Sequence, residues 1–215
     1  MIETIILAGG LGKRMRPLTD DLPKCLIPIN GRPLLDYQLE WLRKNKVEKI
    51  IVACGYKWEK IKHIYGSSFI YSVEGEPLGT GGAVKKALEH IDGHEFLVIN
   101  ADDLNNVNIK DFLRVGSNAT AVSRFYSGFG IVKIKDGKIV EFKEKPLLPY
   151  WANMGLHLLN KDVKFAEKCS LEYDILPALA KKGLLKVYKH KGFWKTANTA
   201  KDLEELEKFF KTRKL

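Results

Sequence analysis

The amino-acid sequence predicts an α/β fold, with a Rossmann-like mixed, mainly parallel sheet, helices on both of its faces and a small α+β portion. Two observations predict it. Up to residue 124, short apolar runs alternate with helical patterns, and beyond that residue a tight-hairpin signal lies between two alternating runs. The 215 residues fit a single domain, 1–215, in which we distinguish a first part, 1–124, and a second part, 125–215.

The first part of the chain is expected to supply the parallel strands and the helices that connect them. Continuous apolar runs between turn residues are typical of strands that are buried on both faces, and helical spacing of apolar residues predicts the segments between them. Parallel strands need right-handed crossovers, which such helices provide. The predicted strands are 5–8, 49–55, 69–73, 96–100 and 119–123, and the predicted helices are 33–45, 59–65, 81–91 and 109–115.

The second part of the chain has a different pattern. Asp136-Gly137 lies between two runs of alternating apolar and polar residues, which predicts a tight β-hairpin. A strand at 153–159, a helix at 173–183, a strand at 184–190 and a charged helix from Asp202 follow. Ligands collect at the carboxyl ends of the strands in open α/β sheets, so the residues just after strands are the functional candidates.

Composition narrows the class of protein. Hydrophobic residues make up 45% and charged residues 29% of the chain, as in soluble globular proteins. The first strand follows the start without a basic leader. We therefore expect a cytoplasmic protein that contacts no membrane. The formal net charge of +10 indicates anionic partners. Because the cations are dispersed and often lie beside acidic residues, small phosphorylated substrates are favoured over nucleic acid. The three widely spaced cysteines are expected to be reduced thiols.

A glycine-rich loop with several cations follows the first strand. The stretch ILAGGLGKRMRPLT, residues 6–19, partly resembles two phosphate-binding patterns. The dinucleotide fingerprint needs a third glycine where Met15 stands, and a P-loop needs serine or threonine after the lysine, where this chain has Arg14. Both patterns fail, yet free backbone N–H groups together with Lys13, Arg14, Arg16 and Lys24 suit a triphosphate.

The same residues carry a resemblance to a known family. LAGGLGKRMRPLTDDLPKCLIPINGRPLLDY resembles the signature of the sugar nucleotidyltransferases, G-x-G-T-R-[LM] followed by P-K-x-[LM], and further matches follow in the family's order. These are YSVEGEPLGTGGAV (71–84), LVINADDL (97–104), VEFKEKP (140–146) and ANMGLHLL (152–159). The pattern is most similar to that of the single-domain guanylyltransferases that act on mannose 1-phosphate or heptose 1-phosphate.

The resemblance implies a reaction and its partners. A sugar 1-phosphate attacks the α-phosphorus of a nucleoside triphosphate, which gives a nucleotide sugar and pyrophosphate in the presence of Mg²⁺. It further implies that 1–124 is the nucleotide-binding part and 125–215 the sugar-binding part with a C-terminal helix, in a monomer or homodimer. Three alternatives stay open: a cytidylyl- or uridylyltransferase that uses a sugar phosphate, a transferase for alditol or choline phosphate, and a non-catalytic regulatory homologue.

The family motifs assign the nucleotide site residue by residue. Arg14 matches the arginine that holds the triphosphate and the leaving pyrophosphate, and Lys24 the lysine near the α-phosphate and the sugar phosphate. Asp102 matches the acidic residue that binds Mg²⁺, and these three form the expected catalytic set. The full nucleotide set is Leu7, Ala8, Gly9, Gly10, Gly12, Lys13, Arg14, Glu74, Gly79, Thr80, Gly81 and Asp102.

A second metal ligand and the choice of base rest on two further residues. Thr196 stands where the family has an aspartate, and Asn198 stands where the cytidylyl variant of the motif has one, so the Asn198 amide oxygen is the expected second Mg²⁺ ligand. Glu74 takes a place where uridylyl relatives often have glutamine. A carboxylate accepts from the N1–H and N2 amino donors of guanine, which favours GTP.

The sugar site is expected in the second part of the chain. Glu144 and Lys145 match the family's E-K-P, with the carboxylate accepting from sugar hydroxyls and the ammonium meeting the sugar phosphate. Asn153 matches the N-x-G motif, and Gly130 matches a glycine that admits the sugar closely. The resemblance therefore divides the two substrates between the two parts of the chain.

Overall fold

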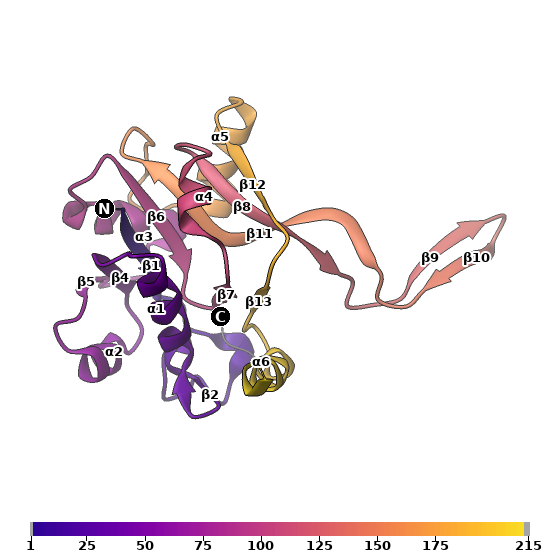
Figure 1. Cartoon of the computed structure of the whole chain (residues 1–215), viewed down its shortest axis with the longest axis horizontal. Helices are drawn as coiled ribbons and strands as arrows, with labels where there is room; N and C mark the ends of the chain where they lie inside the picture. Colours follow the sequence, from indigo (N-terminus) through magenta and orange to yellow (C-terminus); the bar gives the residue numbers. More distant parts are fainter. Residues whose placement is uncertain (1, 213–215) are drawn as a thin grey trace.

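A seven-stranded sheet forms the centre of the molecule, whose computed structural model describes residues 2–212 (Figure 1). Its spatial order is β12-β8-β11-β6-β1-β4-β5, and β11 alone within this sheet runs antiparallel to its neighbours. The predicted mixed, mainly parallel sheet is confirmed. The strands are β1 (Glu3–Leu7), β4 (Ile50–Cys54), β5 (Ile70–Val73), β6 (Glu95–Asn100), β8 (Ala119–Tyr126), β11 (Leu147–Asn160) and β12 (Lys186–His190).

Helices cover both faces of this sheet. Successive side chains of a strand point to opposite faces, so Ile6 joins the apolar cluster under α1, α2 and α4, and Ile5 joins the cluster under α3 and α5. Burial on both faces explains why the strands read as continuous apolar runs. The helices are α1 (Leu34–Lys44), α2 (Trp58–Tyr65), α3 (Gly79–Ala87), α4 (Ile109–Leu113), α5 (Leu176–Lys181) and α6 (Ala200–Thr212), with single helical turns η1 (Lys13–Met15), η2 (Lys24–Leu26), η3 (Leu88–His90) and η4 (Leu171–Ile175).

Some boundaries differ from those that the sequence predicts. The predicted strands 119–123 and 153–159 are parts of the longer β8 and β11, which pair with each other as far as Tyr126 and Leu147. The predicted helix 173–183 is a wide π-helical turn, η4, followed by α5. Pairing across the sheet lengthens a strand beyond its apolar core, and such pairing lies outside the reach of local periodicity.

Two pairs of very short strands were not predicted. β2 (Pro28–Ile29) pairs with β3 (Arg32–Pro33), and β7 (Asp103–Asn105) pairs antiparallel with β13 (Trp194–Thr196). Strands of two or three residues contain no period that a sequence could display. The second pair matters for the site, because it fastens a late segment of the chain beside the end of β6.

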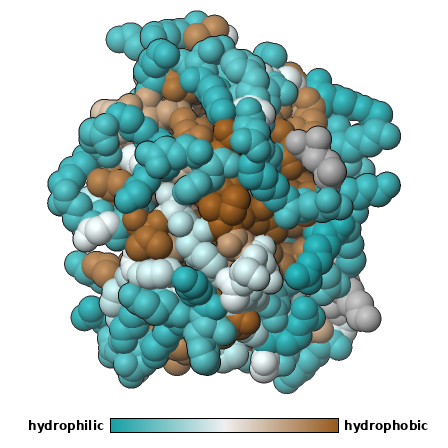
Figure 2. Space-filling model, turned by 90° about the vertical axis from the view of Figure 1, so that its left-hand side faces the viewer, coloured by the Kyte–Doolittle hydropathy of each residue, from teal (hydrophilic) through white to brown (hydrophobic). Residues whose placement is uncertain are grey.

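The predicted hairpin forms an arm outside the body of the molecule (Figure 1). Strands β9 (Ile131–Lys135) and β10 (Lys138–Lys143) pair antiparallel, and both turn residues, Asp136 and Gly137, have positive φ angles of 47° and 72°. Such angles are required by the tight turn that Asp-Gly favours. On the opposite side of the body, polar side chains surround apolar ones near the centre of the face (Figure 2).

Within residues 2–212, none of the helices combines the length and the apolarity needed to cross a membrane.

Candidate active site

A pocket of about 430 Å³ lies at the carboxyl ends of β1 and β6. Open α/β sheets bind ligands at this edge, where several loops meet. The pocket brings together most residues of the predicted nucleotide site and also contains Asn100, at the end of β6. Pro77 and Glu172 line it as well, and the sequence did not single out these two. The predicted residues that line it are Leu7, Ala8, Gly9, Gly10, Gly12, Lys13, Arg14, Lys24, Glu74, Gly79, Thr80 and Asp102.

The loop after β1 is folded on itself by two local contacts. Gly12 has a left-handed conformation with φ of 60°, and a Cβ atom there would lie 2.7 Å from the Thr19 methyl group. Thr19 in turn donates its hydroxyl to the Gly12 carbonyl at 2.9 Å. Met15, which breaks the dinucleotide fingerprint, is buried in the apolar cluster beneath the loop. The buried methionine anchors the turn and leaves its neighbour Arg14 at the pocket.

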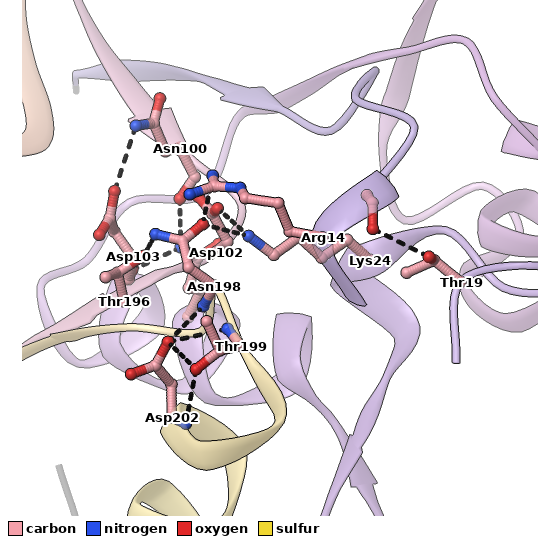
Figure 3. A network of polar contacts seen from close by, with 12 residues as sticks. Arg14, Thr19, Lys24, Asn100, Asp102, Asp103, Thr196, Asn198, Thr199 and Asp202 are labelled. Carbon is pink, nitrogen blue, oxygen red and sulfur yellow. Dashed lines mark hydrogen bonds and ion pairs between the residues drawn. The ribbon is translucent and has the colours of Figure 1, made fainter. Parts of the chain in front are cut away.

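Polar side chains from three distant segments form one network (Figure 3). Arg14, Lys24 and Asp102 of this network line the pocket, and Asn198 lies outside its lining. The Lys24 Nζ donates to Asp102 Oδ2 and, at 2.8 Å, to Asn198 Oδ1. Arg14 Nη2 donates to the same amide oxygen at 2.8 Å. The predicted catalytic residues and the predicted second metal ligand therefore form one connected network, although 174 positions separate Lys24 from Asn198.

A residue of α1 forms hydrogen bonds with the backbone of the turn that carries Asp102. Gln38, which is buried, donates its amide to the carbonyl oxygens of Asn100 and Asp103, each at 2.7 Å. The backbone N–H of Ala197 in turn donates to the Asp102 carbonyl at 2.9 Å. These contacts fix the turn on both sides and leave the Asp102 carboxylate in the pocket. The role of Gln38 could not be predicted from the sequence, because a single glutamine within a helix forms no recognisable motif.

Asn198 reaches the network through β13 and the start of α6. Thr196 pairs with Asp103 across the β7–β13 ladder, which places the next residues beside the end of β6. Asp202 accepts from the backbone N–H groups of Asn198 at 3.0 Å and Thr199 at 2.8 Å, and the Thr199 hydroxyl accepts from Asp202 N–H at 3.2 Å. This reciprocal capping arrangement at the start of α6 orders the backbone that presents Asn198.

Asp103 is buried directly beside the Asp102 carboxylate. It accepts from Asn100 Nδ2 and Trp194 Nε1, both at 3.1 Å. Burial first, and the neighbouring charge of Asp102 second, raise the pKa of Asp103 to about 7, against the opposing effect of those hydrogen bonds and of Lys24. The structure therefore gives two adjacent aspartates different surroundings, one half-exposed beside a lysine and one enclosed among neutral donors.

Glu74 directly follows the last residue of β5 and lies beside Gly9 of the glycine-rich loop. Its carboxylate accepts from the Leu78 N–H at 3.1 Å, and a Cβ atom added to Gly9 would lie 3.1 Å from Glu74 Oε1. Burial raises the pKa of this carboxyl. The absence of a side chain at Gly9 leaves room for this carboxylate oxygen, and Glu74 lines the pocket, where a carboxylate can accept from a ligand.

The glycines at the start of α3 have packing partners. A Cβ atom at Gly79 would lie 2.5 Å from the Cys169 carbonyl oxygen, one at Gly81 would lie 2.6 Å from the Cys169 sulfur, and one at Gly82 would lie 2.3 Å from the Glu167 carbonyl oxygen. Gly81 is buried and lies outside the pocket lining. These glycines let segment 167–169 pack closely on α3. Gly79 also lines the pocket, and the predicted contact of Gly79 and Gly81 with a nucleotide stays a prediction.

Thr80 is likewise held within the protein. Its hydroxyl donates to Glu172 at 2.7 Å and accepts from the Leu171 N–H at 2.8 Å. Both contacts attach η4 to the start of α3 and bring Glu172 to the pocket lining. No local pattern around Glu172 could have revealed this, because it depends on segments 92 positions apart.

The predicted sugar residues lie away from this pocket. Gly130, Glu144 and Lys145 flank the arm, and the exposed Lys145 forms an ion pair with Glu144 at 3.6 Å. Asn153 lies in β11, where its side chain accepts from the Gly155 N–H at 3.0 Å. The structure brings none of these four into the pocket lining, so the sugar half of the predicted site stays a prediction.

The oxygen donors at the pocket suit one kind of metal ion. Asp102 and Asn198 both contact Lys24 Nζ, so a carboxylate and an amide oxygen converge. Residues 2–212 contain no group of three or more histidine, cysteine, aspartate or glutamate side chains that could hold a metal. Mg²⁺ takes one or two protein oxygens and completes its shell with water and substrate phosphates, so the donor set fits this ion and not zinc.

Comparison with known proteins identifies the family. The family model described as nucleotidyl transferase matches residues 3–213. The chain belongs to this family. The resemblance that the sequence motifs indicate is therefore confirmed over nearly the whole chain.

Several members of the nucleotidyl transferase family are similar to this chain. The D-glycero-α-D-manno-heptose 1-phosphate guanylyltransferase of Aneurinibacillus thermoaerophilus is 35% identical over 81% of this chain and 84% of that protein. The glucose-1-phosphate cytidylyltransferase of Salmonella typhimurium is 28% identical over 96% of this chain and 95% of that protein. The crystal structure of HddC from Yersinia pseudotuberculosis complexed with GMP-PN superimposes with a TM-score of 0.77 at 27% identity, covering 98% of this chain and 100% of that one.

The site of this nucleotidyl transferase offers charge and backbone donors in place of a nucleophile. Among the described residues that line the pocket, Cys25 and Thr80 are the ones with a thiol or hydroxyl group. Burial raises the pKa of the Cys25 thiol to about 12, and the Thr80 hydroxyl is engaged with Glu172 and Leu171. A transfer between two phosphates needs neither group, because its nucleophile is already an anion.

Proposed function

We propose that this chain transfers a nucleotidyl group from a nucleoside triphosphate, preferably GTP, to a sugar 1-phosphate. The observation that carries the proposal is the convergence of Arg14 and Lys24 with Asp102 at a pocket bordered by a glycine-rich loop. The names of the relatives support the substrate class, since two heptose 1-phosphate guanylyltransferases are 35% and 34% identical to this chain.

The chemistry follows from those three side chains. A phosphate oxygen of the sugar 1-phosphate attacks the α-phosphorus, the bond from that phosphorus to the bridging oxygen breaks, and pyrophosphate leaves with the electron pair. Arg14 offers a planar fork to the leaving phosphates. Lys24 offsets the charge that two phosphates bring together at the α-phosphorus. Positioning and charge neutralisation therefore supply the catalysis.

Magnesium is part of this proposal. Asp102 and Asn198 would hold the ion, which would supply positive charge to the phosphates of the nucleotide. Lys24 contacts both of these side chains. Binding of a nucleotide with its metal would thus draw the lysine from Asp102 and Asn198 toward phosphate oxygens.

Glu74 supports GTP as the preferred nucleotide. The carboxylate oxygen next to Gly9 accepts hydrogen bonds and donates none while ionised. Guanine presents two neighbouring donors, N1–H and the N2 amino group, and a uracil ring presents one N–H between two acceptors. A site that offers a buried acceptor therefore binds guanine better.

CTP is the second candidate nucleotide. The Salmonella typhimurium relative is a glucose-1-phosphate cytidylyltransferase that aligns over 96% of this chain. Asn198 also occupies the place that the cytidylyl variant of the motif gives to an aspartate. Cytosine has an exocyclic amino donor that Glu74 could accept, so the two bases must be separated by experiment.

Pyrophosphate release from the purified protein tests the proposed function. Four nucleoside triphosphates are crossed with mannose, glucose and heptose 1-phosphates in the presence of Mg²⁺. We expect turnover with GTP and one of the sugar phosphates. Turnover with CTP alone would contradict the preference for guanine that is inferred from Glu74, and no turnover with any pair would favour the regulatory alternative.

The variant Asp102→Ala tests the site itself. We expect a loss of activity of at least about a hundredfold with an unchanged melting temperature, because the side chain is partly exposed and no core contact is removed. Asp162→Ala removes an exposed aspartate far from the pocket and serves as the matched control. Full activity of Asp102→Ala would remove the metal and catalytic assignment together.

A further inference from the structure

A buried histidine lies at an irregularity of β11. His157 has no exposed surface and takes no part in the proposed chemistry. It pairs with Thr120 of β8, while Asn153 pairs with Val122, so the stretch of β11 between these pairs is longer than that of β8. A bulge of this kind re-aims side chains of the longer strand. Here two of them reach the Thr120 hydroxyl, His157 through Nδ1 at 2.9 Å and Asn153 through Oδ1 at 3.3 Å.

The directions of these hydrogen bonds follow from counting protons. Asn153 Oδ1 also accepts from the Gly155 N–H at 3.0 Å, which identifies this atom as the amide oxygen. The single hydrogen of the Thr120 hydroxyl therefore goes to Asn153, and the hydroxyl oxygen accepts from His157 Nδ1. Burial lowers the pKa of His157 to about 4, against the opposing charge of Glu172, so the neutral ring carries one proton.

The other ring nitrogen agrees with a proton on Nδ1. His157 Nε2 is buried and has no hydrogen-bond partner among residues 2–212. A proton on Nε2 would leave a buried N–H donor unpaired, and the Thr120 hydroxyl would then face two acceptors with one hydrogen. A proton on Nδ1 satisfies both contacts of the hydroxyl. A directed chain of hydrogen bonds therefore runs from His157 through Thr120 to the Asn153 amide.

This chain of hydrogen bonds ends beside the pocket. Gly155 has φ of 65°, and a Cβ atom there would overlap Asn100 Nδ2 and Asp103 Oδ2. Asn100 lines the pocket, so the irregular part of β11 packs directly on the catalytic turn. Asn153 is exposed, and its side-chain hydrogen bonds to the described residues all use the amide oxygen. Its Nδ2 group is left as a donor.

We propose that His157 is a positioning residue for the sugar 1-phosphate. Through Thr120 it keeps the Asn153 oxygen turned toward the protein, and it thereby presents the Asn153 Nδ2 group as a donor to an oxygen of this substrate. The inference rests on the proposed function and concerns the acceptor substrate alone. Without the Nδ1 donor, the Thr120 hydroxyl and the Asn153 amide are free to rotate, and binding must then order them.

Two substitutions of His157 separate this role from a structural one. An asparagine side chain keeps a donor at the δ position, whereas a glutamine side chain places its amide at the ε position and loses that donor. Glutamine is closer to histidine in volume, so a purely structural role predicts that His157→Gln is tolerated better than His157→Asn. The proposed role predicts the reverse order.

Steady-state pyrophosphate release measures this order with the sugar phosphate that the unaltered chain turns over. We expect His157→Gln to raise the KM for the sugar phosphate about three- to tenfold, with kcat and the KM for the nucleoside triphosphate unchanged, because binding alone is weakened. His157→Asn should stay within about twofold of the unaltered chain in all three constants.

The middle of the hydrogen-bond chain gives an independent variant. Thr120→Val removes the hydroxyl and nearly keeps the shape, and we expect the same rise in KM for the sugar phosphate. In the double variant with His157→Gln the two effects should not add, because both break one chain. Thr4→Val is the matched control, since Thr4 is a buried threonine of the same sheet whose hydroxyl has no partner among residues 2–212.

Side-chain NMR of the unaltered protein tests the hydrogen-bond chain without relying on a variant's activity. In protein labelled with ¹⁵N-histidine, long-range ¹H–¹⁵N spectra at pH 7 show which ring nitrogen carries the proton, and the signal missing from a variant at position 157 identifies His157. We expect the proton on Nδ1. A proton on Nε2 would overturn the inference, and so would an unchanged KM in His157→Gln. Absence of turnover by the unaltered chain would overturn the proposed function itself.

Discussion

Single residues of the site hold each other in place through opposite charges and shared acceptors. One amide oxygen of Asn198 accepts from both Arg14 and Lys24, while Asp102 accepts from Lys24. An amide positions these cations without neutralising them, because it carries no charge. The network therefore keeps an excess of positive charge, which suits a ligand with several phosphates.

Replacing the Asn198 amide by a carboxylate adds a negative charge next to Arg14, Lys24 and the proposed Mg²⁺ site. In Asn198→Asp, a second anionic oxygen beside Asp102 should lower the Mg²⁺ concentration for half-maximal activity several-fold while activity is retained. Titration of pyrophosphate release with Mg²⁺ measures this. Asn108→Asp is the control, because aspartate caps the start of α4 as well as asparagine does. Complete loss of activity would count against Asn198 as a ligand.

The buried Asp103 predicts how the stability of the metal-free protein depends on pH. Its pKa of about 7 lies above the 3.8 of an exposed aspartate, so the unfolded chain gives up this proton first as the pH rises. The contribution of Asp103 to the free energy of unfolding should therefore fall between about pH 4 and pH 7 and level off above. A single group contributes at most about 1.4 kcal/mol per pH unit.

The variant Asp103→Asn should lack this pH-dependent contribution to the free energy of unfolding. Urea unfolding at pH 5, 6, 7 and 8 without Mg²⁺ gives the free energy of unfolding of both proteins, and we expect the difference between them to favour the variant increasingly toward pH 7. Parallel curves across this range would show that the carboxyl group does not titrate there.

Short elements and loops carry the site, and the regular helices and strands support them. β13 fastens the Asn198 segment to β7, the capping arrangement of α6 orders its backbone, and η4 packs on the start of α3. Each attachment is a few residues long. Small changes of backbone conformation at these points should therefore disturb the pocket more than changes on the helix surfaces do.

The start of α3 offers a direct test of such a change. Gly79 has φ of +76° and lies against the Cys169 carbonyl, so Gly79→Ala should destabilise the fold by about 1–3 kcal/mol through backbone strain and overlap. Gly75 in the preceding loop has nothing within 4 Å of an added Cβ atom and no positive φ. Gly75→Ala should change the free energy of unfolding by less than about 0.5 kcal/mol. Urea unfolding of both variants measures the contrast.

The whole molecule places the pocket and the arm on one continuous sheet. Strands from both sides of residue 124 contribute to that sheet, since β8 and β11 run outward into the arm while β1 and β6 end at the pocket. The chain also carries a net charge of +10. This net positive charge attracts anionic substrates over a distance.

This charge predicts a dependence of activity on salt. Raising KCl from 50 to 500 mM shortens the screening distance, so kcat/KM for the triphosphate should fall several-fold. The value of kcat should change less, because it describes the complex that has already formed. Steady-state kinetics at four salt concentrations measures both constants, with sucrose of equal osmolality as the control. A kcat/KM that does not change with salt would exclude steering by net charge.

Local patterns in the sequence determined the main strands and helices, because alternation and helical spacing report which face of an element is buried. The sequence motifs also singled out Arg14, Lys24 and Asp102, which the structure brings to one pocket. The Asp136-Gly137 turn and its two strands formed as predicted, since that signal lies within a few residues.

Only the tertiary structure decided which distant segments meet. It joined Asn198 to Lys24, set Gln38 under the catalytic turn and brought Glu172 to the pocket, and it gave Gly81 a packing partner. It also directed the arm away from the body. These contacts join residues far apart in the chain, and a local pattern carries no information about a partner that only folding brings near.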